Sequence, residues 1–206
     1  MGFEPGKSDS RLYVRRNKDG KMCFIVIYVD DMVVFCHSEQ EFEEIRVKLG
    51  QHFKLYSLGD LRQFLGIHIE KVDGHYTMCQ ESYIEKLLGR FGHGDAKSSK
   101  VPLDPGYIKQ KEETALPTNT SYRSLVGSLL YVAVNTRPDI SVGTSLLCRK
   151  VSNPTDRDCT EAKRMLRYLK GTKNLRLHLG GGSEGLECFV DADWTGNESD
   201  QKSNSG

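Results

Sequence analysis

The stretch at residues 22–36, MCFIVIYVDDMVVFC, decides how the N-terminal part of the chain folds. Its two runs at 22–29 and 32–36 are rich in β-branched and aromatic residues, which is typical of strands. Asp30 and Asp31 interrupt them, and aspartate tolerates the dihedral angles of tight turns. The sequence therefore predicts a hairpin with two adjacent carboxylates at its tip.

The two carboxylates at this tip repel each other, and their apolar neighbours add a desolvation cost. A divalent cation relieves both effects. Mg²⁺ prefers carboxylate oxygens and commonly uses one or two of them together with substrate phosphates. Two such ions about 3.5–4 Å apart can stabilise the attacking and leaving oxygens of a phosphoryl transfer. The pair thus suggests a polymerase-type metal site, and an acidic, solvated hairpin turn is the alternative.

The remaining patterns predict an α+β fold. Apolar residues at helical spacing predict helices at 38–49, 82–91, 121–134, 139–151 and 155–169. Further strands are expected at 11–15, 53–58, 63–71, 75–79, 175–179 and 186–190. Ser38 followed by Glu41 predicts a capping box, and Thr155 is expected to cap the last helix. The strands at 53–58 and 63–71 are expected to form a hairpin around Gly59–Asp60.

Charge and cysteine content limit the classes of protein to which the chain can belong. The 206 residues carry a formal net charge of +1, so the overall charge of the chain does not by itself indicate a nucleic-acid partner. Residues 149–176 hold nine Lys/Arg against three acidic residues, which fits a polyanion partner or a solvated helix face. The six cysteines lack C-x-x-C spacing, which favours a reducing intracellular compartment, cytoplasmic or nuclear. His68, His75 and Cys79 match no standard zinc spacing, and no apolar run is long enough to span a membrane.

Longer words in the sequence carry a family resemblance. The run IYVDDMVVFCHSEQEFEEIRVKLGQHFKLYSLGDLRQFLGIHIEK resembles the palm of copia-type retrotransposon reverse transcriptases. The words SYIEKLLGRFG, YRSLVGSLLYVAVNTRPDIS, EAKRMLRYLKGT and DADWTG resemble the same Pol polyproteins and follow in the same order. The resemblance covers almost the whole chain, and the order of the words makes it specific.

The resemblance implies roles for individual residues. Asp30 and Asp31 match the catalytic pair that holds Mg²⁺ (or Mn²⁺) during RNA-directed DNA synthesis from dNTPs. Asp191 matches the first metal-binding carboxylate of RNase H. The primer grip, which positions the primer 3′ end, corresponds to Phe64, Leu65, Gly66 and Ile67. Basic residues that could contact phosphates of an RNA–DNA template–primer are Lys163, Arg164, Arg167 and Lys170.

The resemblance also implies a division of the chain. Residues 1–91 correspond to a partial reverse-transcriptase palm, made of antiparallel hairpins and a helix. Residues 92–120 are expected to be a linker, and 121–180 a helical thumb and connection region. Residues 186–206 correspond to the first strand of a truncated RNase H domain.

The polymerase site of this family uses a third carboxylate from an earlier palm strand, and no such strand is expected within the 29 residues that precede Asp30. The fingers and the later RNase H carboxylates are expected to be missing too. Whether the chain is an enzyme is therefore open, and we expect no DNA synthesis by it alone. The alternatives are a non-catalytic nucleic-acid-binding module, or a subunit complemented by other Pol segments.

Overall fold

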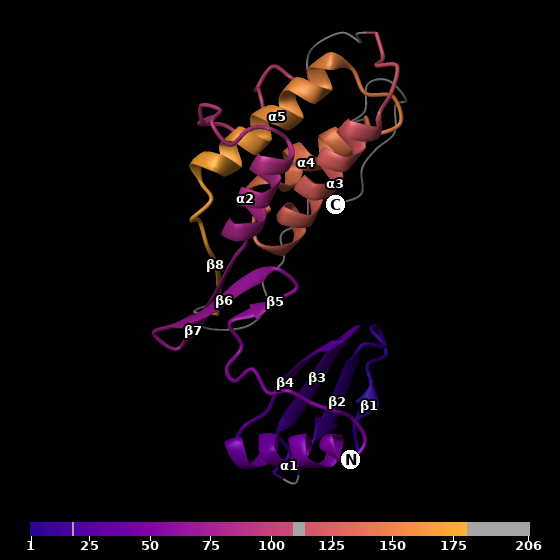
Figure 1. Ribbon diagram of the computed structural model, residues 1–206, viewed down its shortest axis with the longest axis vertical. Coiled ribbons are helices and arrows are strands. Elements are labelled where there is room, and N and C mark those ends of the chain that lie inside the picture. The colour runs from indigo at the N-terminus through magenta and orange to yellow at the C-terminus, as the bar shows by residue number, and fades with distance from the viewer. Residues whose placement is uncertain (18, 109–113, 181–206) are drawn as a thin grey trace.

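The computed structural model is an α+β protein, as predicted, with two antiparallel four-stranded sheets and a group of helices (Figure 1). It describes all residues except 18, 109–113 and 181–206. Figure 1 shows the second sheet between the first sheet and most of the helices. The predicted strand at 186–190 and Asp191 lie outside the described residues.

The first sheet has the order β1-β2-β3-β4 and is covered on one face by α1. Its elements are β1 (Glu4–Pro5), β2 (Leu12–Arg16), β3 (Met22–Tyr28), β4 (Asp31–Phe35) and α1 (Glu39–Gly50). Cys23 and Ile25 of β3 are buried in one cluster with Ile45 of α1. Because side chains alternate along a strand, Tyr28 lies on the opposite face of the sheet.

The N-terminus of α1 is capped as the sequence predicts, with one difference. The Ser38 hydroxyl accepts a hydrogen bond from the Glu41 backbone N–H at 3.1 Å. The Glu41 carboxylate, however, accepts from the backbone N–H of His37 at 3.3 Å rather than from that of Ser38. It also pairs with Arg15 of β2 at 2.8 Å, which ties the helix to the sheet.

The second sheet has the order β5-β6-β7-β8. Its strands are β5 (Gln63–Phe64), β6 (Ile67–Val72), β7 (His75–Cys79) and β8 (Leu177–Leu179). Two-residue loops join its hairpins, namely Leu65–Gly66 and Asp73–Gly74. All four loop residues have positive φ, the pattern of type I′ turns, which follow the twist of the flanking strands.

The prediction of a strand at 53–58 is wrong. This segment is exposed and forms no strand, and the hairpin turn lies at Leu65–Gly66 rather than at Gly59–Asp60. A strand needs a neighbour that satisfies its backbone N–H and C=O groups, and no described strand pairs with this segment. The alternation of apolar residues therefore misled the prediction here.

The helices form the larger core. They are α2 (Glu81–Arg90), α3 (Thr120–Asn135), the 3₁₀ turn η1 (Pro138–Ile140), α4 (Ser141–Cys148) and α5 (Asp156–Gly171). The four α-helices lie near their predicted positions, although α4 is shorter than expected. The predicted cap of α5 is confirmed as a full capping box between Thr155 and Asp158. The centre of this core contains Leu129, Val132, Ile140, Leu147, Ala162, Met165, Leu166 and Leu169, all fully buried.

Two polar arrangements stabilise the helical part. Arg137 is buried, pairs with Asp139 at 2.7 Å and donates to the Thr172 carbonyl at 2.9 Å. The segment after α2 runs along α5, where the Tyr107 hydroxyl donates to the Asp158 carboxylate at 2.5 Å. The predicted domain boundaries at 92 and 120 stay a prediction.

No helix in the described part of the chain is long and apolar enough to cross a membrane. The five described cysteines are free thiols.

Candidate active site at the β3–β4 hairpin

The β3–β4 hairpin carries the two adjacent carboxylates at its tip, as the sequence predicts. Tyr28 pairs with Asp31 across the ladder, so the two-residue loop consists of Val29 and Asp30. The predicted turn at Asp30–Asp31 was therefore displaced by one residue, and Asp31 is the first residue of β4. Both carboxylates are exposed to solvent.

The backbone at the tip is strained. Val29 has a φ of 52°, a left-handed value that a β-branched side chain rarely adopts. Such conformations cost about 1–3 kcal/mol and are found preferentially at functional sites. The Val29 side chain is 82% exposed, so burial of its methyl groups does not offset this cost. The strain falls on the residue that directly precedes the carboxylate pair.

The carboxylate pair provides a partial ligand set for a metal. No group of three or more His, Cys, Asp or Glu residues that could hold an ion occurs among the described residues. Two neighbouring carboxylates are nevertheless what Mg²⁺ commonly takes from a protein when substrate phosphates supply further oxygens. Asp30 and Asp31 therefore fit a magnesium ion shared with a phosphate substrate, and do not form a cage of their own.

The residues predicted as the primer grip form the β5–β6 turn and its base, and this turn approaches the hairpin that carries Asp30 and Asp31. Tyr28 and Leu65 line the same hollow of about 470 Å³, together with Tyr83 of α2 and Tyr131 of α3. Two of the sequence-predicted elements, the carboxylate hairpin and the grip turn, are thus brought to one place. Phe64 and Ile67 pair at the base of the turn, and Ile67 is buried.

Tyr83 and Tyr131 were missed by sequence reasoning. The Tyr131 hydroxyl donates a hydrogen bond to the backbone carbonyl of Leu65. The two tyrosine rings meet edge to face, with centroids 5.1 Å apart. Burial raises the pKa of Tyr131, which keeps its hydroxyl a donor near neutral pH. Both tyrosines lie between apolar residues of predicted helices, and nothing in their local sequence indicated this contact.

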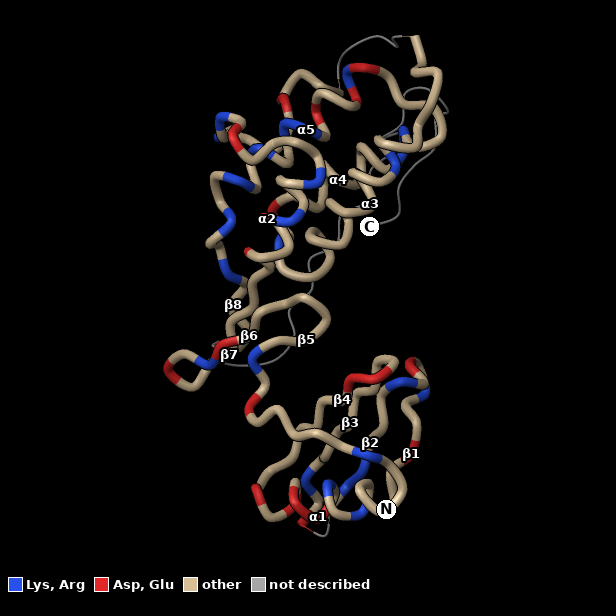
Figure 2. The backbone as a smooth tube through the Cα atoms, viewed as in Figure 1, with Lys and Arg blue, Asp and Glu red and all other residues tan. Residues whose placement is uncertain are grey.

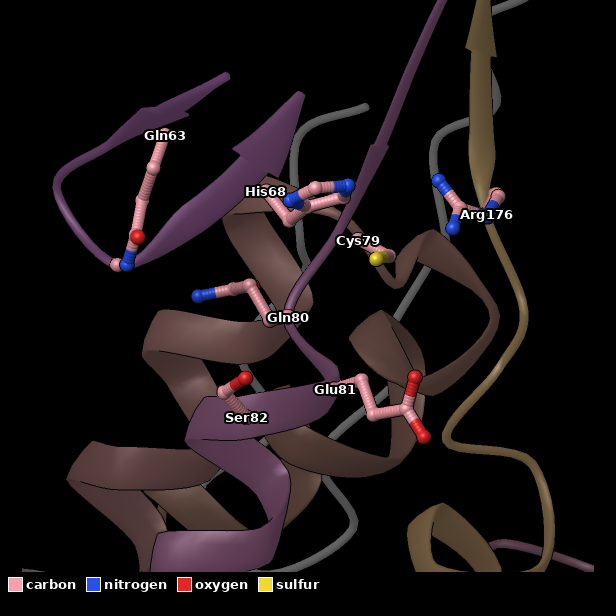
Figure 3. Close-up of a pocket in the computed structure, with 8 residues that line it drawn as sticks. Gln63, His68, Cys79, Gln80, Glu81, Ser82 and Arg176 are labelled. Carbon is pink, nitrogen blue, oxygen red and sulfur yellow. The ribbon is translucent and has the colours of Figure 1, made fainter. Parts of the chain in front are cut away.

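A second hollow borders the β5–β6 turn at Gln63 and Gly66 (Figure 3). Its volume is about 230 Å³, and its lining is mostly polar. The lining residues are Gln63, Gly66, His68, Cys79, Gln80, Glu81, Ser82 and Arg176. His68 pairs with Cys79 across β6 and β7, whereas His75 lies at the far end of this ladder, so the three residues considered for zinc do not come together.

Two of the four predicted phosphate contacts on α5 have partners within the protein. Arg164 pairs with Glu161 at 3.0 Å, and Lys170 donates to the backbone carbonyl of Ala96 at 2.8 Å. Arg167 is half-buried, and Lys163 alone of the four is exposed. Figure 2 shows acidic residues among the basic ones along α5. A nucleic-acid role for the four residues stays a prediction.

Comparison with known proteins agrees with the resemblance seen in the sequence. Residues 1–105 match the family model of the reverse transcriptase (RNA-dependent DNA polymerase). The chain is 32% identical, over 97% of its length, to the retrovirus-related Pol polyprotein from transposon TNT 1-94 of Nicotiana tabacum. It is 34% identical, over its full length, to that from transposon RE1 of Arabidopsis thaliana.

The chain spans only 16% and 14% of the length of these two polyproteins. An uncharacterized mitochondrial protein of Arabidopsis thaliana is closer in size. It is 33% identical over 89% of this chain, and the match covers 76% of that relative. No solved structure matches the chain.

The family model accounts for half of the chain, including the carboxylate hairpin and the grip turn, and the polyprotein relatives extend over nearly all of it. The protein therefore belongs to the reverse transcriptase (RNA-dependent DNA polymerase) family, as a region of the Pol polyproteins of copia-type retrotransposons.

Proposed function

We propose that this chain forms the part of an RNA-directed DNA polymerase that carries the Asp30–Asp31 pair of the nucleotidyl-transfer site. The observation that supports this most is the position of the pair. It lies at the tip of a strained hairpin whose Tyr28 lines a hollow together with Leu65 of the grip turn. A primer strand resting on that turn would have its 3′ end close to the carboxylates.

Asp30 and Asp31 are the residues that would hold Mg²⁺ or Mn²⁺, together with the phosphates of an incoming dNTP. When bound, such ions supply charge stabilisation for the attacking and leaving oxygens. The protein's own contribution is positioning, on which phosphoryl transfer mainly depends. Tyr28 offers an aromatic face next to the carboxylates, and the backbone of Gly66, which has no side chain, allows a strand to approach closely.

We further propose that the site is completed by another Pol segment that supplies a third carboxylate. The two carboxylates of the hairpin have no third acidic residue in coordinating range within the described part of the chain. Mg²⁺ demands near-ideal octahedral coordination, so an incomplete ligand set weakens both affinity and geometry. The 206-residue chain is then inactive by itself.

Binding of Mn²⁺ tests the metal site independently of turnover. Electron paramagnetic resonance of the purified chain with an RNA–DNA template–primer and dNTP should detect bound Mn²⁺, and the Asp30→Asn and Asp31→Asn variants should lose it. Asp73→Asn is a matched control, because Asp73 is an exposed aspartate in another two-residue hairpin turn. Equal loss in the control, or retention in both site variants, would contradict the assignment.

Primer extension tests the dependence on another segment. The chain alone should give no template-directed incorporation with Mg²⁺ or Mn²⁺. Addition of the segment that precedes the matching region in a related Pol polyprotein should restore synthesis, and Asp30→Asn should abolish it again. Synthesis by the chain alone that Asp30→Asn removes would show that these residues need no complement.

A further inference from the structure

The polar hollow beside the β5–β6 turn contains a buried hydrogen-bond donor for which the described part of the chain offers no acceptor. Gln80, between β7 and α2, is 2% exposed, and its Oε1 accepts from the Thr136 hydroxyl at 2.8 Å. This contact orients the amide. Its Nε2 is shielded from solvent and has no hydrogen-bond partner among the residues that the structure describes. Figure 3 shows this nitrogen directed toward Gln63, on the opposite wall of the hollow.

An unsatisfied buried donor costs free energy, and the great majority of such groups in folded proteins have partners. A donor that faces a hollow with polar walls therefore points to an acceptor that enters it. The hollow, at about 230 Å³, is large enough for more than a single water molecule. The acceptor is thus to be sought among small oxygen-bearing groups.

The N-terminus of α2 reaches the same hollow and adds further donors. Helix α2 has ten residues, and Gln80 is its N-cap residue without a side-chain capping bond. Glu81 and Ser82, the first two residues of the helix, line the hollow. The N–H groups of a first helical turn have no intrahelical partner, and the helix dipole favours negative charge beside them. Backbone donors and the Gln80 amide thus meet at one place.

The charged residues of the hollow are already paired in a way that leaves the donors available. The Glu81 carboxylate pairs with Lys173 at 3.1 Å, and Figure 3 shows it on the side of the helix away from the Gln80 nitrogen. Arg176 pairs with Glu70 at 2.9 Å. The carboxylate and the guanidinium that line the hollow are thus both paired, whereas the buried Gln80 Nε2 is a donor without a partner among the described residues.

We propose that this hollow binds a phosphate group, held by Gln80 Nε2, the Ser82 hydroxyl and the backbone N–H groups at the start of α2. A phosphate offers several acceptor oxygens and a negative charge, and helix N-termini bind it readily. We take the phosphate group to be a phosphodiester of the primer strand, and this part of the proposal rests on the proposed function. Gly66 lines this hollow whereas Leu65 lines the hollow beside Tyr28, so a strand crossing the turn would meet both.

Nuclear magnetic resonance can follow the groups concerned. Inorganic phosphate, titrated into the purified ¹⁵N-labelled chain, should shift the Gln80 side-chain amide and the Ser82 backbone N–H. An RNA–DNA template–primer should shift the same signals at a much lower concentration if a phosphodiester is the ligand. Shifts with inorganic phosphate but not with the template–primer would support a phosphate site and assign it to a free phosphate.

Gln80→Glu replaces the donor by a negative charge of nearly the same shape and should weaken phosphate binding about tenfold or more. Gln51→Glu is the matched control, because Gln51 is exposed at the end of α1, and it should leave binding unchanged. Ser82→Ala, which needs no change in the core, should weaken binding to a smaller extent. It keeps the inference testable if the buried variant does not fold.

The outcomes for the site and for the proposed function can be told apart. If the template–primer shifts signals of Tyr28 and Leu65, and neither it nor inorganic phosphate shifts those of Gln80 and Ser82, the phosphate site is wrong and the proposed function stands. If the template–primer shifts no signal, the proposed function fails, and the phosphate titration decides the inference. Absence of any response of Gln80 and Ser82 to phosphate would overturn it.

Discussion

The Tyr131 hydroxyl donates a hydrogen bond to the backbone carbonyl of Leu65, a residue 66 positions earlier in the chain. This contact joins α3 to the turn of the β5–β6 hairpin. Leu65 has a φ of 51°, which is unfavourable for a residue with a side chain. The helical part of the molecule thus helps to hold the grip turn in a conformation that a two-strand hairpin would maintain only marginally alone.

Tyr131→Phe should destabilise the grip turn. It removes one hydrogen bond, worth about 0.5–1.5 kcal/mol, and retains the ring that packs against Tyr83. Hydrogen exchange should show faster exchange of the β5–β6 amides, with little change in α5. Tyr76→Phe is the matched control, because Tyr76 lies on the same sheet and its hydroxyl has no hydrogen-bond partner among the described residues. Unchanged exchange in Tyr131→Phe would contradict a role in holding the turn.

Val29→Gly should stabilise the protein slightly. The left-handed conformation costs a residue with a side chain about 1–2 kcal/mol, whereas glycine adopts it freely but loses about 0.4–1 kcal/mol through the unfolded state. A net gain of about 0.5–1 kcal/mol is expected in urea denaturation. Val34→Gly, at a position in regular strand conformation on β4, should instead destabilise the protein. A loss of similar size in both variants would argue against strain at Val29.

Tyr107→Phe should loosen the segment that runs along α5. The Tyr107 hydroxyl donates to the buried carboxylate of Asp158, and a hydrogen bond to a charged group contributes about 1.5–3 kcal/mol. Burial, together with this bond, raises the pKa of Tyr107, so the hydroxyl remains a donor at neutral pH. Chemical denaturation should show the loss, and Tyr56→Phe, at an exposed tyrosine, should not. Equal stability of the two variants would contradict the anchoring role.

The stability of the helical part should fall in acid because of Asp139. Burial opposes ionisation of its carboxyl group, but hydrogen bonds from Arg137 and Tyr168 outweigh this and lower its pKa below the ordinary value of 3.8. A lowered folded-state pKa stabilises the fold above 3.8, and this contribution is lost as the pH falls through the folded-state value. The stability difference between the wild-type protein and Asp139→Asn should therefore shrink below about pH 4.

The same substitution in an Arg137→Met background provides the control for this pH dependence. Without the guanidinium, the main group that lowers the Asp139 pKa is gone, and the stability difference should depend much less on pH. An unchanged pH profile in that background would show that Arg137 does not cause the effect. The midpoint of thermal or urea unfolding, measured between pH 3 and pH 7, is a suitable readout.

Local patterns predicted most of the helices well. The cap at Thr155 depends on residues near each other in sequence, which is why it could be predicted there. The hairpin at 53–71 was misplaced for the opposite reason. Alternating apolar residues favour a strand, but whether a strand forms depends on a neighbour that lies elsewhere in the chain.

The candidate site shows the same division. The carboxylate pair and the four residues 64–67 were picked out in the sequence as quoted words, although these four were also expected to lie within a continuous strand. The tyrosines on α2 and α3 and the unsatisfied amide of Gln80 were not picked out, because each acquires its role only when elements far apart in the chain pack together. The sequence also did not show that two of the predicted phosphate contacts on α5, Arg164 and Lys170, have partners within the protein.

By itself, the sequence determined the family, through its resemblance to known Pol polyproteins. It also determined the α+β class and the presence of Asp30 and Asp31 at a hairpin tip, because these follow from short-range patterns of apolar, turn and acidic residues. Only the tertiary structure decided that the loop consists of Val29 and Asp30, that Tyr131 holds Leu65, and that two hollows flank the grip turn. Backbone strain and contacts between distant segments are stabilised by the packing of the whole fold, and no local stretch of sequence encodes them.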